Sequence, residues 1–156
     1  MTDRYVGQRV LVTGASGFIG GTLCRRLHNS GAEIHAISRA VGESGEIRWW
    51  QGDLTSFGVV DYLIARIRPD TVFHLAGEVT GSRDLPLILK TLQHNLVSTV
   101  NLLTSLAEHG CQAVVLAGSM EEPCEGEDTP GSPYAASKWA SSGYARMFSA
   151  LYQLRI

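Results

Sequence analysis

The sequence predicts an α/β fold in which a parallel β-sheet is covered by helices on both faces. Three observations support this prediction. Short apolar segments recur along the 156 residues, stretches with helical spacing lie between most of them, and the first apolar segment runs directly into a glycine-rich turn. Parallel strands need helical crossovers, and strands buried on both faces are nearly continuously apolar. We therefore expect one doubly wound domain over residues 1–156.

In the first half of the chain, glycine, serine and proline mark where the elements end. Ser30-Gly31 ends the first helix, and Arg68-Pro69-Asp70 ends the second. The adjacent Trp49 and Trp50 predict a strand with one ring in the core. The expected order is a strand at 10–12, a helix at 18–29, strands at 32–38 and 47–51, and a helix from Thr55 or Ser56 to about residue 67.

The second half continues the alternation. A nearly continuous apolar strand is expected at 71–76 and another at 113–117. Between them, leucine and valine recur at helical spacing through one long helix at 87–109, which Gly110 ends. A polar loop at 118–132 precedes a last helix from Tyr134 to about residue 152.

The glycine-rich turn after the first strand has the context of a nucleotide-phosphate loop. Gly14 permits a sharp exit from the strand, and Gly17 lets the backbone approach a pyrophosphate. Gly20 lets the helix lie close to the strand. The N–H groups and positive dipole end of that helix would face the anion. Because Ala15 and Ser16 separate Gly14 from Gly17, the spacing departs from the common G-x-G-x-x-G, and an ordinary tight turn is the alternative.

The end of the second strand bears on cofactor choice. An NAD-binding protein usually has an acidic residue there, which binds the adenosine ribose. Here Ser38 is followed by Arg39, which can pair with a 2′-phosphate, so the sequence favours NADP over NAD. A solvated loop cation is the alternative for Arg39. Asp53, followed by Leu54, could accept a hydrogen bond from the adenine amino group or serve as a turn residue.

Candidate catalytic residues follow the fifth strand. Tyr134 and Lys138 are four apart on one helix, and an ammonium group near a phenol lowers the phenol pKa, which makes Tyr134 a candidate acid/base. Ser119 lies at the carboxyl edge of the sheet and could donate a hydrogen bond to a substrate oxygen. Glu121 could be a second proton carrier. The alternatives are a helix surface for the pair, a turn for Ser119 and a solvated acidic loop for Glu121.

Composition excludes several classes of protein. A net charge of −2 with scattered Arg and Lys argues against nucleic-acid binding. No apolar run reaches the ~20 residues that span a bilayer, and the N-terminus does not resemble a signal peptide. Cys24, Cys111 and Cys124 show no C-x-x-C spacing, and the histidines are dispersed, so we expect no zinc site and a cytoplasmic location.

Taken together, these residues resemble the extended short-chain dehydrogenase/reductase family, the NAD(P)-dependent sugar-nucleotide epimerases and dehydratases. The matching segments run in order through the whole chain. They are TGASGFIG at 13–20, DL at 53–54, HLAG at 74–77, Asn95 with TVNLL at 99–103, SME at 119–121, and SPYAASK at 132–138.

The resemblance implies a Rossmann-type sheet, an NADP or NAD cofactor and a nucleotide-sugar substrate. Tyr134 would be the acid/base, Lys138 would bind the nicotinamide ribose and tune Tyr134, and Ser119 would be the hydroxyl partner. Glu121 matches the base of the dehydratases, although Met120 stands where some of them have Asp. The implied cofactor-binding residues are Gly14, Ser16, Gly17, Phe18, Ile19, Gly20, Ser38, Arg39, Asp53, Leu54, Leu75, Ala76, Gly77, Asn95, Tyr134 and Lys138.

Two departures from the family limit this expectation. The segment between Ser119 and Tyr134 is shorter than usual, and residues 151–156 look like the approach to a sixth strand, where the chain stops. The later strands and the C-terminal substrate domain are therefore expected to lie outside this chain, which leaves an exposed sheet edge beside strand five.

Three functions remain open at this point. The first is the cofactor half of an epimerase or dehydratase acting on a nucleotide sugar by transient hydride transfer. The second is an NADP-dependent reductase of a non-sugar carbonyl, and the third a non-catalytic NADP-binding module. The resemblance also implies a homodimer paired through the helix at 87–109 and the Tyr134 helix.

Overall fold

A computed structural model describes residues 5–40, 45–123 and 129–156. Its five strands form one parallel sheet in the order β3-β2-β1-β4-β5. The predicted α/β class and parallel sheet are confirmed. The strands are β1 (Arg9–Thr13), β2 (Glu33–Ser38), β3 (Ile47–Gln51), β4 (Thr71–His74) and β5 (Ala113–Leu116), and the helical segments are α1 (Phe18–Asn29), α2 (Phe57–Ile67), α3 (Leu87–Thr91), η2 (Leu92–Val97), α4 (Ser98–His109) and α5 (Pro133–Tyr152).

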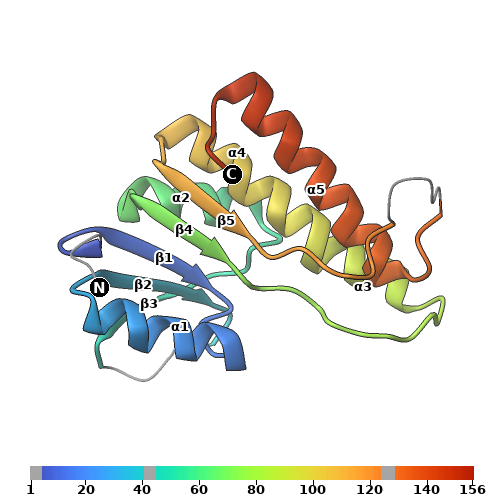
Figure 1. The fold of residues 1–156 in the computed structure, drawn as a ribbon, viewed down its shortest axis with the longest axis horizontal. Helices are drawn as coiled ribbons and strands as arrows, with labels where there is room; N and C mark the ends of the chain where they lie inside the picture. Colours follow the sequence, from blue (N-terminus) through green and yellow to red (C-terminus); the bar gives the residue numbers. More distant parts are fainter. Residues whose placement is uncertain (1–4, 41–44, 124–128) are drawn as a thin grey trace.

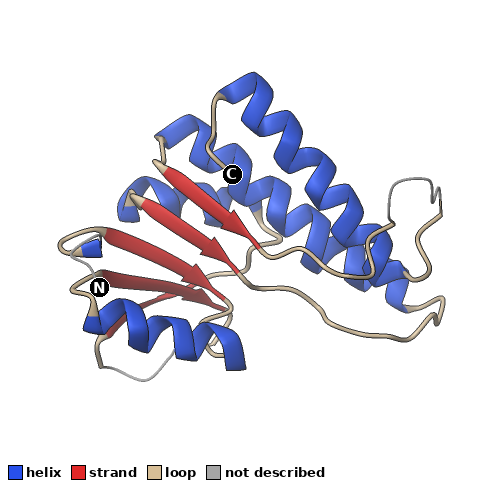
Figure 2. Cartoon of the chain, viewed as in Figure 1, coloured by secondary structure: helices blue, strands red, loops and turns tan. Residues whose placement is uncertain are grey.

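Side chains that alternate along the strands build two cores, one on each face of the sheet. On one face, Val10 and Val12 of β1 pack with Cys24 and Leu27 of α1. On the other, Leu11 of the same strand joins a larger core with α2, α4 and α5. Figures 1 and 2 show α1 below the sheet and the other three helices above it. The two cores fix the sheet between helix layers and so hold the strand ends in place.

Coverage of the sheet is less even than the sequence predicted. On the face of the sheet that carries Val10 and Val12, α1 is the helix of the described residues that packs there, and it covers β1 and β2. Over β4 and β5, Phe73 contacts Tyr5 with ring centroids 6.5 Å apart, and Val115 is 46% exposed. The tryptophan pair also differs from the prediction, because Trp49 and Trp50 are each partly buried, against opposite cores.

The predicted helix at 87–109 is one continuous helical segment, but its middle turn, η2, is a π-helix. Hydroxyl groups bind the carbonyl groups in this region. Ser98 donates to the carbonyl oxygen of His94 at 2.7 Å, and Thr99 donates to that of Asn95 at 2.6 Å. A π-turn places an extra residue in the helix and redirects the side chains around it. Apolar periodicity does not reveal such a turn, and here it buries Asn95.

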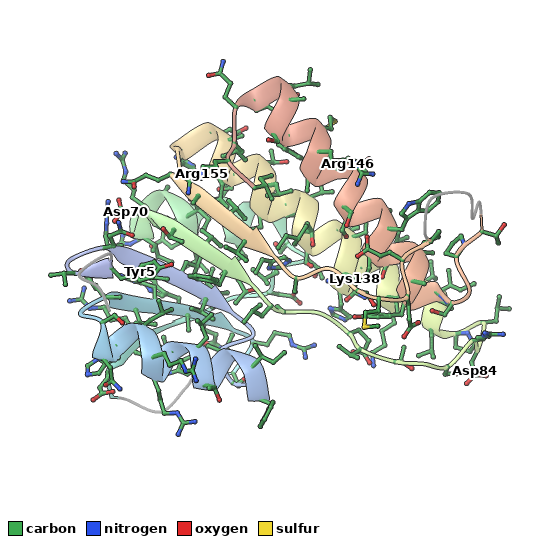
Figure 3. All side chains as sticks on the ribbon, in the orientation of Figure 1. Tyr5, Asp70, Asp84, Lys138, Arg146 and Arg155 are labelled. Atoms are coloured by element: carbon green, nitrogen blue, oxygen red, sulfur yellow. The ribbon has the colours of Figure 1, made fainter. Side chains whose placement is uncertain are left out.

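The end of the chain lies along the outer strand of the sheet. After α5, the N–H of Val114 in β5 donates to the carbonyl oxygen of Arg155 at 2.8 Å, and Leu154 is buried in the larger core. Figure 3 shows Arg155 beside β5. Residues 154–156 therefore occupy the place expected for the start of a sixth strand, and the edge of β5 is partly covered.

Candidate functional site

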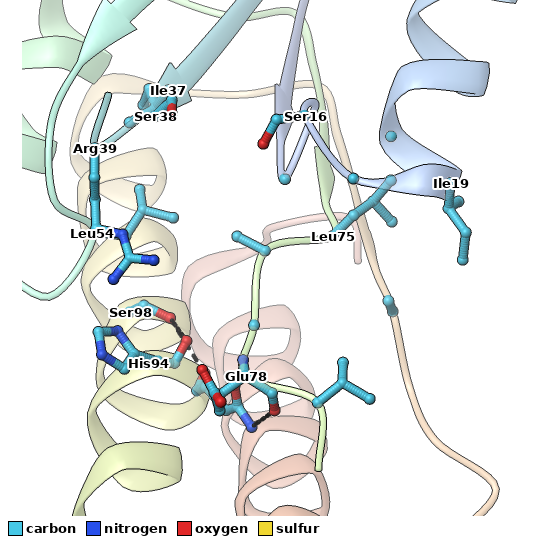
Figure 4. Close-up of a pocket in the computed structure, with 18 of the residues that line it drawn as sticks. Ser16, Ile19, Ile37, Ser38, Arg39, Leu54, Leu75, Glu78, His94 and Ser98 are labelled. Atoms are coloured by element: carbon cyan, nitrogen blue, oxygen red, sulfur yellow. Dashed lines mark hydrogen bonds between the residues drawn. The ribbon is translucent and has the colours of Figure 1, made fainter. Parts of the chain in front are cut away.

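A cleft of about 650 Å³ lies at the carboxyl ends of the strands, where the order reverses between β1 and β4. This crevice is where open α/β sheets bind ligands. Figure 4 shows residues from the ends of β1, β2 and β4 facing it, together with η2. All the residues predicted to bind the cofactor line this one cleft: Gly14, Ser16, Gly17, Phe18, Ile19, Gly20, Ser38, Arg39, Asp53, Leu54, Leu75, Ala76, Gly77, Asn95, Tyr134 and Lys138.

The glycine turn is shaped by close backbone contacts. Gly14 has a φ of +71°, and a Cβ there would lie 2.8 Å from the backbone N of Ala76. The N–H of Gly17 donates to the carbonyl oxygen of Gly14 at 3.0 Å. A Cβ on Gly20 would collide with the Gly14 carbonyl oxygen, so α1 starts tightly against the turn. The predicted reasons for Gly14, a sharp turn, and Gly20, close packing of the helix, agree with these contacts.

The start of α1 suits an anion. Gly17 is its N-cap residue, no side chain caps the helix, and its first turn has no acidic residue. The first N–H groups of a helix lack intrahelical partners, and the helix dipole favours negative charge there. Because Gly17 and Phe18 line the cleft, this end of it can hold a phosphate group.

Ser38, Arg39 and Asp53 lie at the ends of β2 and β3, on the same wall as the glycine turn. The Arg39 side chain extends from the end of β2 along the cleft (Figure 4). Asp53 Oδ1 accepts from both the N–H and the hydroxyl of Thr55 at 2.9 Å. The backbone hydrogen bond from Thr55 is the main cause that lowers the pKa of Asp53. Asp53 is thus a turn residue that also lines the cleft, and an adenine contact stays a prediction.

Behind the opposite wall, His74 is held in a buried hydrogen-bond chain. Its Nδ1 lies 2.7 Å from Thr13 Oγ1, and its Nε2 lies 3.0 Å from Thr99 Oγ1. Thr13 Oγ1 accepts from the N–H groups of Leu75 and Ala76, so its own proton points to Nδ1. Thr99 donates its proton to the Asn95 carbonyl, so it accepts from Nε2. His74 is therefore neutral with the proton on Nε2, in agreement with a pKa that burial, and secondarily the charge of Lys138, lowers to about 3.

Asn95 connects this wall to α5. Its side-chain oxygen accepts from the N–H of Glu78 at 2.6 Å, and its amide donates to the Glu78 carbonyl and to Ser137 Oγ. Ser137 in turn donates to the carbonyl oxygen of Tyr134 at 2.7 Å. The buried amide therefore fixes the segment after β4 relative to the first turn of α5.

The start of α5 brings the candidate acid/base to the cleft. Ser132 caps the helix by accepting from the N–H of Ala135 at 3.0 Å, and Pro133 follows at the first helical position. Tyr134 and Lys138 both line the cleft and are partly buried, and Figure 3 marks Lys138 near the start of the helix. Burial lowers the pKa of the Lys138 ammonium, and the charge of Glu122 opposes this effect. The glycine turn and the candidate acid/base thus share one cavity.

Comparison with known proteins identifies the family. The model of the NAD dependent epimerase/dehydratase family matches residues 10–156. The chain belongs to this family. It is 31% identical to the UDP-glucose 4-epimerase of Mycolicibacterium smegmatis over 94% of this chain and 53% of that protein, and 28% identical to the dTDP-glucose 4,6-dehydratase of Haemophilus influenzae over the same shares. The chain thus spans about half the length of these relatives.

Solved structures of epimerases have the same fold as this epimerase/dehydratase-family chain. The Thermotoga maritima UDP-glucose 4-epimerase with UDP-glucose superposes with a TM-score of 0.82 at 21% identity, over 94% of this chain and 52% of that one. The Thermus thermophilus UDP-glucose 4-epimerase complex with NAD superposes with a TM-score of 0.77 at 28% identity, over the same shares.

Two of the predicted catalytic residues of this family member lie outside the cleft lining. The neighbouring Gly118 lines it, whereas Ser119 and Glu121 do not. Ser119 Oγ accepts from the N–H of Glu121 at 3.2 Å, and the exposed Glu121 accepts from the Ser132 hydroxyl at 3.0 Å. Their catalytic roles stay predictions. Cys124 and the acidic residues at 125, 127 and 128 fall outside the described residues.

Sequence reasoning also missed residues that line the cleft. Glu78 lies there and pairs with Lys90 at 2.7 Å, and His94 and Ser98 face the cleft from η2 and the start of α4 (Figure 4). Glu78 directly follows a motif glycine, and both helical residues lie within three positions of Asn95. The available sequence signal for these three residues was therefore that they lie close to the motifs. The direction of the His94 and Ser98 side chains depends on the π-turn, which the sequence did not predict.

Two further searches concern metals and membranes. In the part of the chain that the structure describes, Asp61, Glu108 and His109 have ligand atoms within 4.8 Å of one another, and none of the three lines the cleft. Asp61 is already hydrogen-bonded to His109 and Ser105. The described helices include none with the length and apolar character needed to cross a bilayer.

Proposed function

We propose that the protein containing this chain is an NAD(P)-dependent epimerase or dehydratase of a nucleotide-activated sugar, and that the cleft holds the cofactor. One observation carries the proposal: the glycine turn with its uncapped helix start and the Tyr134–Lys138 pair line the same cavity. The family match and the epimerases among the relatives support the reaction class. The chain spans about half the length of those relatives, and we propose that sugar recognition depends on a domain outside these 156 residues.

The residues present fit a dinucleotide. Gly14 and Gly20 leave space where a Cβ would meet backbone, and the first N–H groups of α1 would bind the pyrophosphate. Ser38, Arg39 and Asp53 would face the adenosine, and Lys138 the nicotinamide ribose. The known relative solved with NAD supports a nicotinamide cofactor, and the NADP preference remains a prediction from Ser38 and Arg39.

The nicotinamide, when bound, supplies a hydride acceptor next to the sugar. In the proposed mechanism Tyr134, as phenolate, takes the proton of the sugar hydroxyl as the carbon loses hydride. The Lys138 ammonium, held on the same face of α5, stabilises that phenolate. Ser119 would hydrogen-bond the same substrate oxygen, and Glu121 would serve as the additional base in a dehydratase. In the reverse step the phenol returns the proton to the same oxygen, and Tyr134 is again a phenolate.

The test is Tyr134→Phe in the full-length protein, assayed with UDP- and dTDP-sugars. We expect turnover to fall about 100-fold or more, because general acid–base catalysis contributes 10²–10⁴-fold, while cofactor affinity by calorimetry stays within about threefold. Unchanged turnover would contradict the proposal. Turnover of simple ketones with NADPH but not of sugars would favour the reductase alternative, and cofactor binding without any turnover would favour a binding module.

We also propose the homodimer implied by the family resemblance, paired through the α3–η2–α4 helix and α5. Large side chains on α5 support this, since Trp139, Tyr144 and Leu151 are 41%, 42% and 67% exposed. Light scattering on the full-length protein should give twice the monomer mass. A monomeric mass would contradict it. The predicted cytoplasmic location is part of the same proposal.

A further inference from the structure

Glu122, which the sequence analysis did not single out, joins the loop after β5 to helix α5. Its Oε1 accepts the backbone N–H of Ser119 at 2.7 Å, and its Oε2 accepts the hydroxyl of Ser142 at 2.6 Å. Ser142 is four residues beyond Lys138, so both lie on the same face of α5. A single partly buried carboxylate therefore bridges two segments that are distant in sequence, and both carry proposed catalytic residues.

The contact on the loop side is close. A Cβ on Gly118 would lie 3.1 Å from Glu122 Oε1, and Gly118 lines the cleft. The adjacent Glu121 behaves differently, because it is exposed and accepts from Ser132. Of the two neighbouring carboxylates, Glu122 is thus the one that fixes where the Ser119 backbone lies relative to α5.

Through its hydrogen bond to Ser142, the Glu122 carboxylate is held one helical turn from Lys138 on the same face of α5. Burial disfavours the charged form of Lys138, and Glu122 is the negative group that favours it. From β4, His74 faces the same lysine, but His74 is neutral, with a pKa of about 3. Tyr134 lies on the same helix face, one turn earlier. The negative charge that compensates the partly buried ammonium among these groups comes from Glu122.

We propose that Glu122 is a positioning residue that holds the Ser119 loop against α5 and supplies the counter-charge of Lys138. This inference rests on the proposed function, because Ser119, Tyr134 and Lys138 are that function's catalytic residues. Glu122 itself takes no part in proton transfer to substrate. It acts through the hydrogen bond to the Ser119 backbone and through its charge on the lysine.

The first test measures the charge effect without catalysis. In full-length protein labelled with ¹³C-lysine, the Lys138 signal is assigned by its loss in Lys138→Arg and titrated by NMR. Glu122→Gln keeps the side chain's size and can still accept from Ser119, but it removes the charge. We expect the Lys138 pKa to fall by about half a unit or more, a change typical of losing one nearby opposite charge. An unchanged pKa would overturn the counter-charge role whether or not the protein is an epimerase.

The second test measures catalysis. We expect Glu122→Gln to move the alkaline limb of the kcat–pH profile to lower pH by a similar amount, with KM changed less than about twofold. Glu122→Ala loses both hydrogen bonds as well, and we expect kcat to fall about tenfold or more because Ser119 is displaced. Glu122→Asp should recover part of this loss. Glu108→Gln, an exposed glutamate at the end of α4, is the matched control and should leave the profile unchanged.

The outcomes separate the two proposals. Wild-type kcat and pH profile in Glu122→Ala would overturn the positioning role while leaving the epimerase or dehydratase proposal intact. A wild-type protein inactive on every nucleotide sugar would instead contradict the proposed function, and the NMR titration would still decide the electrostatic part of the inference.

Discussion

The two walls of the cleft are built in different ways. The wall formed by the ends of β1, β2 and β3 is shaped by backbone, because Gly14 and Gly20 lie where a Cβ would meet main-chain atoms. The wall formed by β4, η2 and α5 is held by buried side-chain hydrogen bonds centred on His74 and Asn95. The shape of the first wall thus depends on its glycines, whereas that of the second depends on particular pairs of polar groups.

The two walls meet at Gly14, where we expect a substitution to have the largest effect. Gly14 contacts the backbone of Leu75 and Ala76, and Thr13 beside it begins the hydrogen-bond chain to His74. A change at Gly14 therefore affects the shape of the first wall and its attachment to the second. Each prediction below changes one residue of a wall and compares it with a control residue outside the cleft lining.

The largest expected effect is that of Gly14→Ala. Alanine would have to adopt a φ of +71° and place its Cβ 2.8 Å from backbone atoms of Leu75 and Ala76, just after β4. We expect the free energy of unfolding to fall by about 3 kcal/mol or more, because the left-handed conformation and a main-chain overlap are both costly. Cofactor affinity should fall with it. Urea unfolding and calorimetry measure the two effects.

Gly58→Ala is the matched control for this prediction. Gly58 lies in the first turn of α2, and a Cβ there meets nothing within 4 Å. Alanine should change the free energy of unfolding by less than about 1 kcal/mol, in the stabilising direction, because it is the better helix former. If both variants lose the same stability, the glycine turn is not shaped by its backbone contacts.

The backbone wall is also the part that the sequence predicted best. Glycines report on local main-chain geometry, and the roles predicted for Gly14 and Gly20 agree with the structure. The parallel sheet with apolar side chains on both faces was predicted from the apolar segments in the same way, whereas the strand order comes from the structure. The π-turn at η2 was not predicted, since the Asn95 side chain depends on partners in the segment after β4 and in α5. The role of Glu122 was not predicted for a similar reason, because its partner Ser142 lies 20 residues later in the chain, on α5.

The second prediction concerns how the stability of the side-chain wall depends on pH. His74 stays neutral in the folded protein down to about pH 3, whereas an unfolded histidine titrates near 6.5. Between these values the unfolded state binds the extra proton, so this contribution to stability is present above about pH 6.5 and is lost as pH falls. From pH 7.5 to pH 5 we expect the free energy of unfolding to drop by about 2 kcal/mol through His74, at roughly 1.4 kcal/mol per pH unit below 6.5.

The measurement compares urea unfolding at pH 7.5 and pH 5 in the wild type and in His74→Gln. The variant should be less stable at pH 7.5, because its hydrogen bonds to Thr13 and Thr99 are disrupted, but its stability should depend less on pH. His28→Gln is the control, since His28 is 40% exposed and pairs with Glu46 at the surface. An equal pH dependence in wild type and His74→Gln would show that the buried histidine does not cause the loss of stability at low pH.

The smallest expected effect returns to the backbone wall and concerns the charged side chain at the end of β2. Arg39→Ala should weaken NADP⁺ binding about tenfold, because a charge-assisted hydrogen bond to the 2′-phosphate is lost. NAD⁺ binding should change less than about threefold, and the free energy of unfolding should stay within about 0.5 kcal/mol of the wild type. Calorimetry with both cofactors measures the difference, and Arg25→Ala on the exposed face of α1 is the control. An equal loss for both cofactors would place the Arg39 contact on a group that the two share, and a wild type that prefers NAD⁺ would contradict the NADP preference. In either case, cofactor choice would depend on groups other than the Arg39 charge. The wall built from backbone would in that case bind the diphosphate that NAD⁺ and NADP⁺ share without distinguishing their riboses.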